Sequence, residues 1–396
     1  MATTSGTRES RSRTSSQAGS EVLPYGRQSI SESDIAKVAE VLRSDWLTTG
    51  PTVMEFERRV GELAGGHRAV SSTSGTSALH MAYIAADIRP GDEVVATPMT
   101  FIATTSAASM IGAKVIFADV EEDTALLDPA AVEDALTERT KVIAAVDYAG
   151  HPADYDALQS IADKVGALTL GDAAHSIGGS YRGRPVGDLA DLTAFSFFPT
   201  KNMTTGEGGA LVSRDEVLAR RAHEFHFIGL VRDPSRFKLQ DEGPWHQEVH
   251  EFGVNYRLTD VACALGLAQL DRLAAFKQRR AEITARYNAA LADVDGLRTP
   301  TQRSDVDPMW HLYPVRVLDG RRRKVFEEMR SKGIGVQVNY IPVYWHPVYA
   351  DAGYKRGMCP NAEAFYAEEL SLPIFPDLTD DDVDRVIDVL IEAVNR

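Results

Sequence analysis

The 396-residue sequence has two cysteines, Cys263 and Cys359, and no CxxC pair. Two cysteines are too few for a disulfide framework, and their spacing matches neither a zinc ribbon nor a redox motif. We expect both to be packing residues in a reducing compartment, which favours the cytoplasm. The sequence also has no apolar run approaching the roughly 18 residues of a membrane helix, so no membrane span is expected.

Basic residues are in the minority. The chain has 42 Lys and Arg against 57 Asp and Glu, for a formal net charge of -15. Nucleic acids are bound by clustered Lys and Arg, so a nucleic-acid partner is not expected, although small anionic ligands could still bind at local sites. The content of 44% hydrophobic and 25% charged residues predicts a soluble globular protein, long enough for two domains.

The start of the chain has little hydrophobic content. Residues 1–22 are rich in Ser, Thr and Arg, and we expect a disordered tail. The segment Ser31-Glu-Ser-Asp34 then resembles a capping box. Because Ile35, Val38 and Leu42 follow at helical spacing, it predicts an amphipathic entry helix.

From residue 68 onward, short apolar runs alternate with helical patterns. The expected strands are 68–71, 93–97, 114–118, 141–146 and 167–170. The expected helices between them are 76–86, 102–111, 129–136 and 155–165. This alternation predicts βαβ units and a mostly parallel sheet, in which ligands bind beyond the carboxyl ends of the strands.

The second half of the chain predicts a different arrangement. Residues 258–291 form a long helix or a helix pair that leads to a second domain. A small α/β unit follows, made of 311–317, 322–332 and 335–338, and 381–394 closes it.

Lys201 follows the apolar segment 193–198, which reads as a buried strand, and precedes the glycine-rich segment 206–209. The ordinary role of a lysine is a solvated surface charge. A lysine at the end of a buried strand can instead become neutral and react with an aldehyde, and nearby glycines let the backbone approach a ligand.

Asp172 lies just past an earlier expected strand, in Leu170-Gly-Asp-Ala-Ala-His175. It could cap a helix that begins at Ala173. It could also face a protonated pyridine nitrogen and keep that ring cationic, so that the ring accepts electrons from a substrate carbon. A reactive lysine together with such an aspartate points to pyridoxal phosphate (PLP).

Phosphate-binding candidates lie on two elements. Ser74, Gly75 and Thr76 open a helix directly after a strand, where free N–H groups and the helix dipole attract phosphate, although such a turn is also an ordinary helix cap. Ser196 could add a hydroxyl. Phe101 is either a core residue or an aromatic ring stacked on the cofactor.

Histidines suggest an alternative from another class, a zinc hydrolase. His246 and His250 have the i, i+4 spacing of a zinc site. In an HExxH motif Glu follows the first His, whereas Gln247 does here, and Gly243-Pro244 before them predicts a loop.

The motifs together resemble the DegT/StrS group of PLP-dependent nucleotide-sugar aminotransferases, from Leu23 to about Val394. The segments that carry the resemblance are 74–79, 89–93, 171–175, 196–201, 205–209 and 255–260. The resemblance implies PLP fold type I, an α/β fold with a mostly parallel seven-stranded sheet in the large domain and a smaller C-terminal α/β domain. The expected division is a tail over 1–22, a PLP-binding domain over 23–265, and a bridging helix with the small domain over 266–396.

The resemblance also implies the roles of site residues. Lys201 would form the Schiff base, Asp172 would face the pyridinium nitrogen, and His175 would lie near the phenolic oxygen. The other implied cofactor contacts are Ser74, Gly75, Thr76 and Ser196 at the phosphate, Phe101 on the ring, and Asn255. In relatives, the asparagine at the position of Asn255 reaches the phosphate bound in the neighbouring subunit. The resemblance therefore implies a homodimer with shared active sites.

Within the family, the chain is most similar to the subgroup that aminates the 4-position of a UDP-4-keto-6-deoxy-N-acetylhexosamine in pseudaminic acid synthesis. The segments 23–27, 44–51, 337–343 and 362–366 carry this similarity. The chain departs from the subgroup at Phe198, Thr200, Asn339 and His151. These departures leave other UDP- or dTDP-keto sugars open, and a PLP-binding regulatory or structural relative without turnover is a further alternative.

Overall fold

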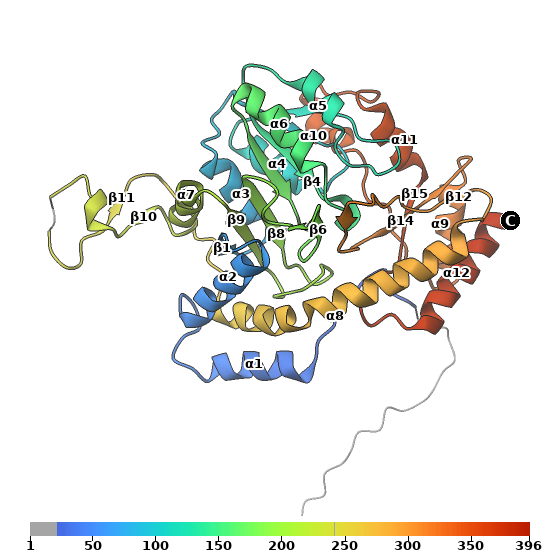
Figure 1. Ribbon diagram of the computed structural model, residues 1–396, viewed down its shortest axis with the longest axis horizontal. Coiled ribbons are helices and arrows are strands. Elements are labelled where there is room, and N and C mark those ends of the chain that lie inside the picture. Colours follow the sequence, from blue (N-terminus) through green and yellow to red (C-terminus); the bar gives the residue numbers. More distant parts are fainter. Residues whose placement is uncertain (1–21, 241) are drawn as a thin grey trace, which may run out of the picture.

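A seven-stranded sheet forms the centre of the computed structural model, which describes residues 22–240 and 242–396 (Figure 1). The tail predicted over 1–22 therefore lies almost wholly outside the described residues. Across the sheet the strands run in the order β1-β9-β8-β5-β4-β2-β3. Their bounds are β1 Arg68–Ser72, β2 Glu93–Ala96, β3 Lys114–Phe117, β4 Thr140–Val146, β5 Leu168–Asp172, β8 Leu192–Ser196 and β9 Gly209–Ser213.

Strand direction confirms the predicted parallel character. The β3/β2, β2/β4, β4/β5 and β5/β8 pairs are parallel, whereas β9 runs antiparallel to both β8 and β1. The apolar pattern before residue 200 locates six of these strands. It does not locate β9, because this short return strand begins in a glycine-rich segment where hydrophobic periodicity is weak.

Helices cover both faces of the sheet. The helices on one face are α3 Gly75–Ala85, α4 Ala103–Met110 and α7 Glu216–His226. The helices on the other face are α2 Pro51–Leu63, α5 Pro129–Ala135, α6 Tyr155–Val165 and α8 Asp260–Leu291. Alternation along β2 shows the two faces, since Val94 and Ala96 join one core and Val95 the other. This strand is therefore apolar on both sides, as expected for a strand inside a buried parallel sheet.

The predicted long helix or helix pair is a single helix, α8 (Figure 1). The helix α1 Glu32–Leu42 packs against it and begins with the predicted capping box, in which Ser31 and Asp34 bond each other's backbone N–H. The expected domain boundary between residues 265 and 266 falls within α8. The division into domains stays a prediction.

A smaller antiparallel sheet, β12-β14-β15, lies at the far end of α8 (Figure 1). This part contains β12 Leu297–Arg298, β14 Tyr313–Val317, β15 Glu369–Leu372, α9 Arg322–Ser331, α10 Pro347–Asp351, α11 Pro360–Glu368 and α12 Asp380–Asn395. The expected strand over 335–338 makes only an isolated bridge between Gln337 and Ser371. The remaining short elements are β6 Ser180–Tyr181, β7 Arg184–Pro185, β13 Val306–Asp307, and 3-10 turns at Tyr148–Gly150, Pro234–Arg236 and Val343–Trp345.

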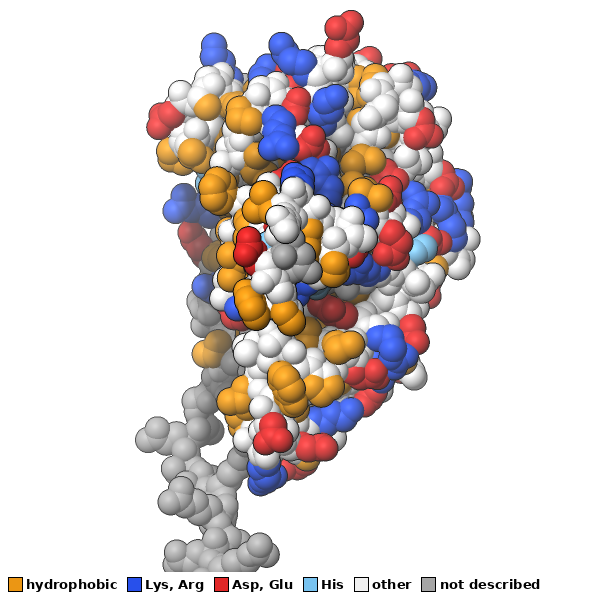
Figure 2. Space-filling model, turned by 90° about the vertical axis from the view of Figure 1, so that its left-hand side faces the viewer, with side chains coloured by type: hydrophobic (Ala, Val, Ile, Leu, Met, Phe, Trp, Pro, Cys, Tyr) orange, Lys and Arg blue, Asp and Glu red, His pale blue; other side chains and the backbone are white. Residues whose placement is uncertain are grey.

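A hairpin projects from the body between α7 and α8 (Figure 1). We call residues 227–240 and 242–253 the arm; it contains β10 Leu230–Val231 and β11 Glu248–Val249. Hydrophobic side chains gather on this face of the molecule (Figure 2). In the arm, Trp245 is 76% exposed and Phe252 is 99% exposed. Over residues 22–240 and 242–396, no helix is both long and apolar enough to cross a bilayer.

Asp260 joins α8 to α2. Its buried carboxylate accepts hydrogen bonds from the backbone N–H of Gly50, Thr52 and Val53, at 2.8, 3.0 and 3.3 Å. These are N–H groups at the start of α2, and its N-cap Gly50 has no side chain to satisfy them. A residue distant in sequence therefore caps this helix.

We expect Asp260→Ala to destabilise the protein by about 2 kcal/mol, because it leaves buried N–H groups of a helix start without an acceptor. Thermal or urea unfolding of the purified protein measures this loss. Asp271→Asn on the same helix is the control, since Asp271 is 47% exposed and forms surface ion pairs worth about 0.5 kcal/mol or less. Equal effects of the two substitutions would contradict the capping role.

Candidate functional site

A cavity of about 480 Å³ opens at the carboxyl ends of the parallel strands. Eight of the nine site residues expected from the sequence line it, namely Ser74, Gly75, Thr76, Phe101, Asp172, His175, Ser196 and Lys201. The ninth, Asn255, is not among the lining residues. The topology brings these side chains together because β5 and β8 are parallel neighbours, with Asp172 beside Ala194 and Ser196 closing β8.

Asp172, the last residue of β5, is buried at 6% exposure. Thr104 Oγ1 donates to its Oδ2 at 2.6 Å, and the Ala174 N–H donates to Oδ1 at 3.2 Å. Burial raises the pKa of Asp172, while these two donors and the charge of Lys201 oppose the shift. Residues 174–178 form a turn and no α-helix begins at Ala173, so the helix-cap alternative does not apply.

Lys201 lies partly buried in the loop between β8 and β9 and reaches the cavity. Burial lowers the pKa of its amine from 10.5 to about 8, and the negative charge of Asp172 acts in the opposite direction. With a pKa of about 8, roughly a tenth of this amine is uncharged at pH 7, far more than for an ordinary lysine, and the neutral amine is the nucleophile.

His175 contacts two aromatic rings. The His311 ring centroid lies 4.3 Å away, and the Tyr340 ring stacks at 6.2 Å with its hydroxyl 3.2 Å from His175 Nε2. Burial, together with the charge of Lys201, lowers the pKa of His175 well below its ordinary range. The imidazole is therefore neutral.

Ser74, which also lines the cavity, caps α3. Its side chain accepts from Ser77 N at 3.1 Å, and Ser77 Oγ accepts from Ser74 N at 2.8 Å. The predicted helix start is confirmed, and the cap and the cavity lining involve the same residue. A Cβ added to Gly75 would lie 2.7 Å from Ser196 Cβ, so α3 and β8 approach each other too closely here for any larger residue.

Two of the predicted residues have weaker ties to the cavity. Phe101 is not a core residue, since it is 59% exposed, and its ring lies 6.3 Å from that of Tyr340 at the cavity rim. Asn255 pairs with Phe227 through a β-bridge at the base of the arm. The neighbouring Tyr256 carbonyl accepts from Thr73 N, immediately before Ser74.

The histidines of the zinc alternative lie in the arm, on either side of β11 rather than on one helix face. His246 Nε2 and His250 Nε2 both contact the carboxylate of Glu248, at 3.2 and 2.5 Å. Among the described residues, no group of three or more His, Cys, Asp or Glu side chains is arranged to hold a metal ion. This geometry does not support the zinc hydrolase.

Sequence motifs did not identify the residues that support the site. Thr104 holds Asp172 and contacts Thr100 Oγ1 at 2.7 Å, while Asn202 contacts His311 at 3.2 Å and donates to the carbonyls of His175 and Met309. In the sequence, Thr104 is only a threonine one turn after Phe101, and Asn202 is only a polar residue directly after Lys201. Neither position identifies a supporting residue of the site unless the fold is known.

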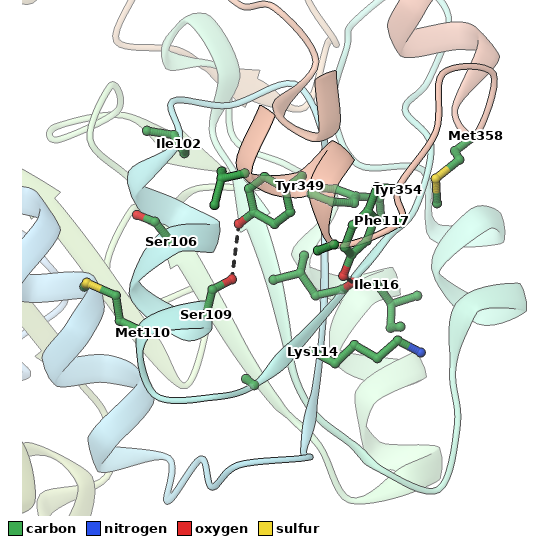
Figure 3. A pocket seen from close by; sticks show the side chains of 15 residues that line it. Ile102, Ser106, Ser109, Met110, Lys114, Ile116, Phe117, Tyr349, Tyr354 and Met358 are labelled. Carbon is green, nitrogen blue, oxygen red and sulfur yellow. Dashed lines mark hydrogen bonds between the residues drawn. The ribbon is translucent and has the colours of Figure 1, made fainter. Parts of the chain in front are cut away.

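A second, larger cavity of about 860 Å³ lies outside the site, along the edge strand β3 (Figure 3). α4 and α10 form its walls, and its lining is mainly apolar. Tyr349 bonds Ser109 across it at 3.2 Å (Figure 3). Nothing in the structure shows what covers this groove.

Comparison with known proteins shows which family the chain belongs to. Residues 28–391 match the family described as the DegT/DnrJ/EryC1/StrS aminotransferase family. The chain belongs to this family. Membership confirms the predicted family, fold and enzyme class, and similar structures in PLP and PMP forms confirm pyridoxal phosphate as the cofactor.

Several relatives are similar over nearly their whole length. The spore coat polysaccharide biosynthesis protein SpsC of Bacillus subtilis is 39% identical, covering 94% of this chain and 97% of the relative. A Streptococcus pneumoniae protein assigned as a sugar aminotransferase has structures in PLP and PMP forms, which superimpose on this chain with TM-scores of 0.88 and 0.89 respectively. The PMP form is 31% identical, and the alignment covers 94% of this chain and 99% of that chain. PseC of Helicobacter pylori, an aminotransferase of pseudoaminic acid biosynthesis, is 28% identical with a TM-score of 0.88, covering 95% of this chain and all of its own.

The residues around the cavity fit pyridoxal phosphate. A lysine with a lowered pKa can meet its aldehyde, and a buried carboxylate can face its ring nitrogen. The start of α3 offers free N–H groups for a phosphate beside the Ser196 hydroxyl. His175 lines the same cavity, next to the lysine and the carboxylate.

The pKa of Lys201 predicts the pH dependence of its reactivity in the apo protein. Carbamylation of Lys201 by cyanate, followed by peptide mass spectrometry, should rise with a midpoint near pH 8, because only the neutral amine reacts. In Asp172→Asn the midpoint should move to lower pH, since the charge that stabilises the ammonium is gone. A midpoint at 10.5, or a shift upward in the variant, would contradict this electrostatic picture.

Proposed function

We propose that the protein is a PLP-dependent sugar aminotransferase that moves an amino group from an amino acid, glutamate, to the 4-position of a UDP-4-keto-6-deoxy-N-acetylhexosamine. The observation that carries this proposal is the convergence of Lys201, Asp172 and the start of α3 on one cavity. Bound pyridoxal phosphate supplies an aldehyde that takes up the amino group and a ring that accepts electrons.

Lys201 performs the proton transfers. It holds the cofactor in the resting enzyme, and once displaced by the donor, its Nζ takes the proton from the α-carbon of the amino acid. In the second half-reaction, Nζ returns a proton to the sugar carbon that becomes the amine carbon. The lowered pKa suits both steps, because a general base works best when its pKa lies near the operating pH.

Asp172 keeps the ring nitrogen protonated. Thr104 and the Ala174 N–H orient its carboxylate, and the surrounding core excludes water that would weaken the interaction. Gly75, Thr76, Ser74 and Ser196 bind the phosphate, and this contact fixes the register of the cofactor against Lys201. Phe101 covers the ring from the exposed rim.

The substrate assignment rests on the segments shared with the pseudaminic acid subgroup, and likeness to PseC supports it. Phe198, Thr200 and Asn339, where the chain departs from that subgroup, all line the cavity. These three departures therefore lie where they can alter which keto-sugar nucleotide fits, whereas the fourth, His151, is buried outside this cavity.

The reverse reaction tests this function. Purified enzyme with 2-oxoglutarate and a UDP-4-amino-4,6-dideoxy-N-acetylhexosamine should form glutamate, faster than with dTDP-amino sugars. Lys201→Ala should bind the cofactor, as its absorbance shows, but lose turnover, because the Nζ that carries the proton in both half-reactions is gone. Lys114→Ala, at the exposed edge strand, should retain it.

Each outcome separates the alternatives. Cofactor binding without glutamate formation from any amino-sugar nucleotide favours the relative without turnover. Glutamate formed only from a dTDP sugar corrects the nucleotide. Turnover by Lys201→Ala would show that another lysine acts.

The active form is a homodimer in which the arm of one subunit completes the site of the other. Asn255 follows the arm directly, pairs with Phe227 at its start, and lies outside its own cavity. Trp245 and Phe252 expose large apolar surfaces that a second copy would cover. Asn255 then contacts the phosphate bound by the partner.

Mixing two inactive variants tests the shared site. Lys201→Ala and Asn255→Ala subunits, unfolded and refolded together, should recover about a quarter of the wild-type activity, because half of the dimers are mixed and each has one intact site. Each variant refolded alone is the control. If Asn255 acts within its own subunit, the mixture stays inactive.

A further inference from the structure

We propose that Glu369 is a positioning residue whose ionisation sets the polarity of one wall of the cavity. While this carboxyl is ionised, Asn339 presents a hydrogen-bond acceptor to the ligand and Tyr25 presents a donor. When the carboxyl is protonated, the two side chains exchange these roles. The juxtaposition that carries this proposal is a chain of hydrogen bonds from Glu369 through Ser371 to Asn339 and Tyr25.

The chain begins at a fully buried carboxyl. Glu369, the first residue of β15, is 0% exposed, and its side chain forms no ion pair among the described residues. Its Oε2 accepts from the backbone N–H of Asn339 at 2.6 Å, and its Oε1 contacts Ser371 Oγ. Because Oε2 is already an acceptor, a proton taken up by this carboxyl lies on Oε1, where it faces Ser371.

The other end of the chain reaches the cavity. Asn339 and Tyr25 both line it, while Ser371 is buried and does not. Asn339 Nδ2 lies 2.8 Å from the Tyr25 hydroxyl and 3.0 Å from Ser371 Oγ. Among the described residues, Asn339 Oδ1 has no hydrogen bond, and it is not one of the buried atoms that lack a partner. This carbonyl oxygen therefore faces open space, and the cavity is the open space that Asn339 lines.

The number of protons fixes the direction of each bond while Glu369 is ionised. A carboxylate only accepts, so Ser371 donates its single proton to Glu369 and must accept from Asn339. The amide NH2 then points to Ser371 and Tyr25, and Oδ1 faces the cavity. Because the Tyr25 hydroxyl accepts from the amide, its own proton is free to meet a ligand.

Protonation of Glu369 reverses the chain. Oε1 then donates to Ser371 Oγ, and the Ser371 proton turns to the amide. Asn339 turns over, because the two ends of an amide have nearly the same shape and Oδ1 can accept from both hydroxyls. Its NH2 group now faces the cavity, and Tyr25, which donates to Oδ1, offers the ligand only a lone pair.

The surroundings of Glu369 bring this change close to neutral pH. Burial raises its pKa to about 8, and the hydrogen bonds from Ser371 and the Asn339 N–H, with the charge of Arg322 on α9, oppose the shift. The other titratable groups around it are the phenols Tyr25, Tyr148 and Tyr340. Burial raises the pKa of each phenol above its ordinary range, so the phenols stay protonated while Glu369 changes charge.

The polarity of this wall selects among ligands, and this use rests on the proposed function, in which the cavity takes the keto-sugar nucleotide. Asn339 favours a sugar hydroxyl that donates when Glu369 is ionised, and a ligand oxygen that accepts when Glu369 is protonated. The reason is that a desolvated donor facing a donor, or an acceptor facing an acceptor, stays unsatisfied. A residue outside the cavity lining thus determines what the lining recognises.

Side-chain amide NMR tests the inversion in the full chain loaded with pyridoxal phosphate and labelled with nitrogen-15 asparagine. Asn339 is assigned by the signal lost in Asn339→Ala. In the wild type its Nδ2 signal should move between two positions with a midpoint near pH 8. Above that pH its protons should exchange with solvent more slowly than in Glu369→Gln, because they are bonded to Ser371 and Tyr25.

Three substitutions separate the network from other titrating groups. Glu369→Gln donates permanently to Ser371, as the protonated carboxyl does, and should hold the Asn339 signal in its low-pH position. Ser371→Ala breaks the chain and should also abolish the titration, so the test does not depend on the folding of one variant. Glu368→Gln is the matched control, since Glu368 pairs with Arg316 outside the network and its loss should leave the titration unchanged.

An Asn339 signal that does not move across pH 8 in the wild type overturns the proposal without any variant. A titration that persists in Glu369→Gln or in Ser371→Ala also overturns it, because another group then drives the change. No substrate is present in this experiment, so either result leaves the proposed function standing. Failure to form glutamate from any amino-sugar nucleotide would instead refute that function, and the NMR titration would be unaffected.

Discussion

The juxtaposition of Lys201 and Asp172 is the constraint on which the rest of the site depends. Each group is displaced from its ordinary ionisation by burial, and each partly restores the other through opposite charge. This balance holds only while β5 and β8 stay paired in parallel and the surrounding core excludes water. The two-sided hydrophobic core thus maintains the electrostatics of the cavity as well as the fold.

Contacts distant in sequence stabilise that arrangement. Asp260 at the start of α8 caps α2, and α8 continues to the C-terminal sheet, so one helix contacts both parts of the molecule. The C-terminal part returns Tyr340 and His311 to the cavity wall. The walls of the cavity therefore come from segments more than a hundred residues apart. The shape of the site depends on the tertiary packing of these segments.

The sequence predicted the local features well. The capping box at Ser31, the helix start at Ser74, six strands of the central sheet and the helical character of residues 258–291 follow from short-range patterns, because hydrophobic periodicity and side-chain capping act within a few residues. The strand β9 was not located, since its glycines remove the pattern. Of the residues expected from motifs, only Asn255 lies outside the cavity lining.

By itself, the sequence determined the chemical types at the strand ends: a lysine, an aspartate and a serine-glycine turn, each placed by the strand before it. Only the tertiary structure decided what supports them. Thr104 on Asp172, and Tyr340 and His311 on His175, are ordinary residues in ordinary segments. The physical reason is that hydrogen bonds and ring contacts between distant segments depend on how the sheet, α8 and the C-terminal part pack, and no local pattern encodes that packing.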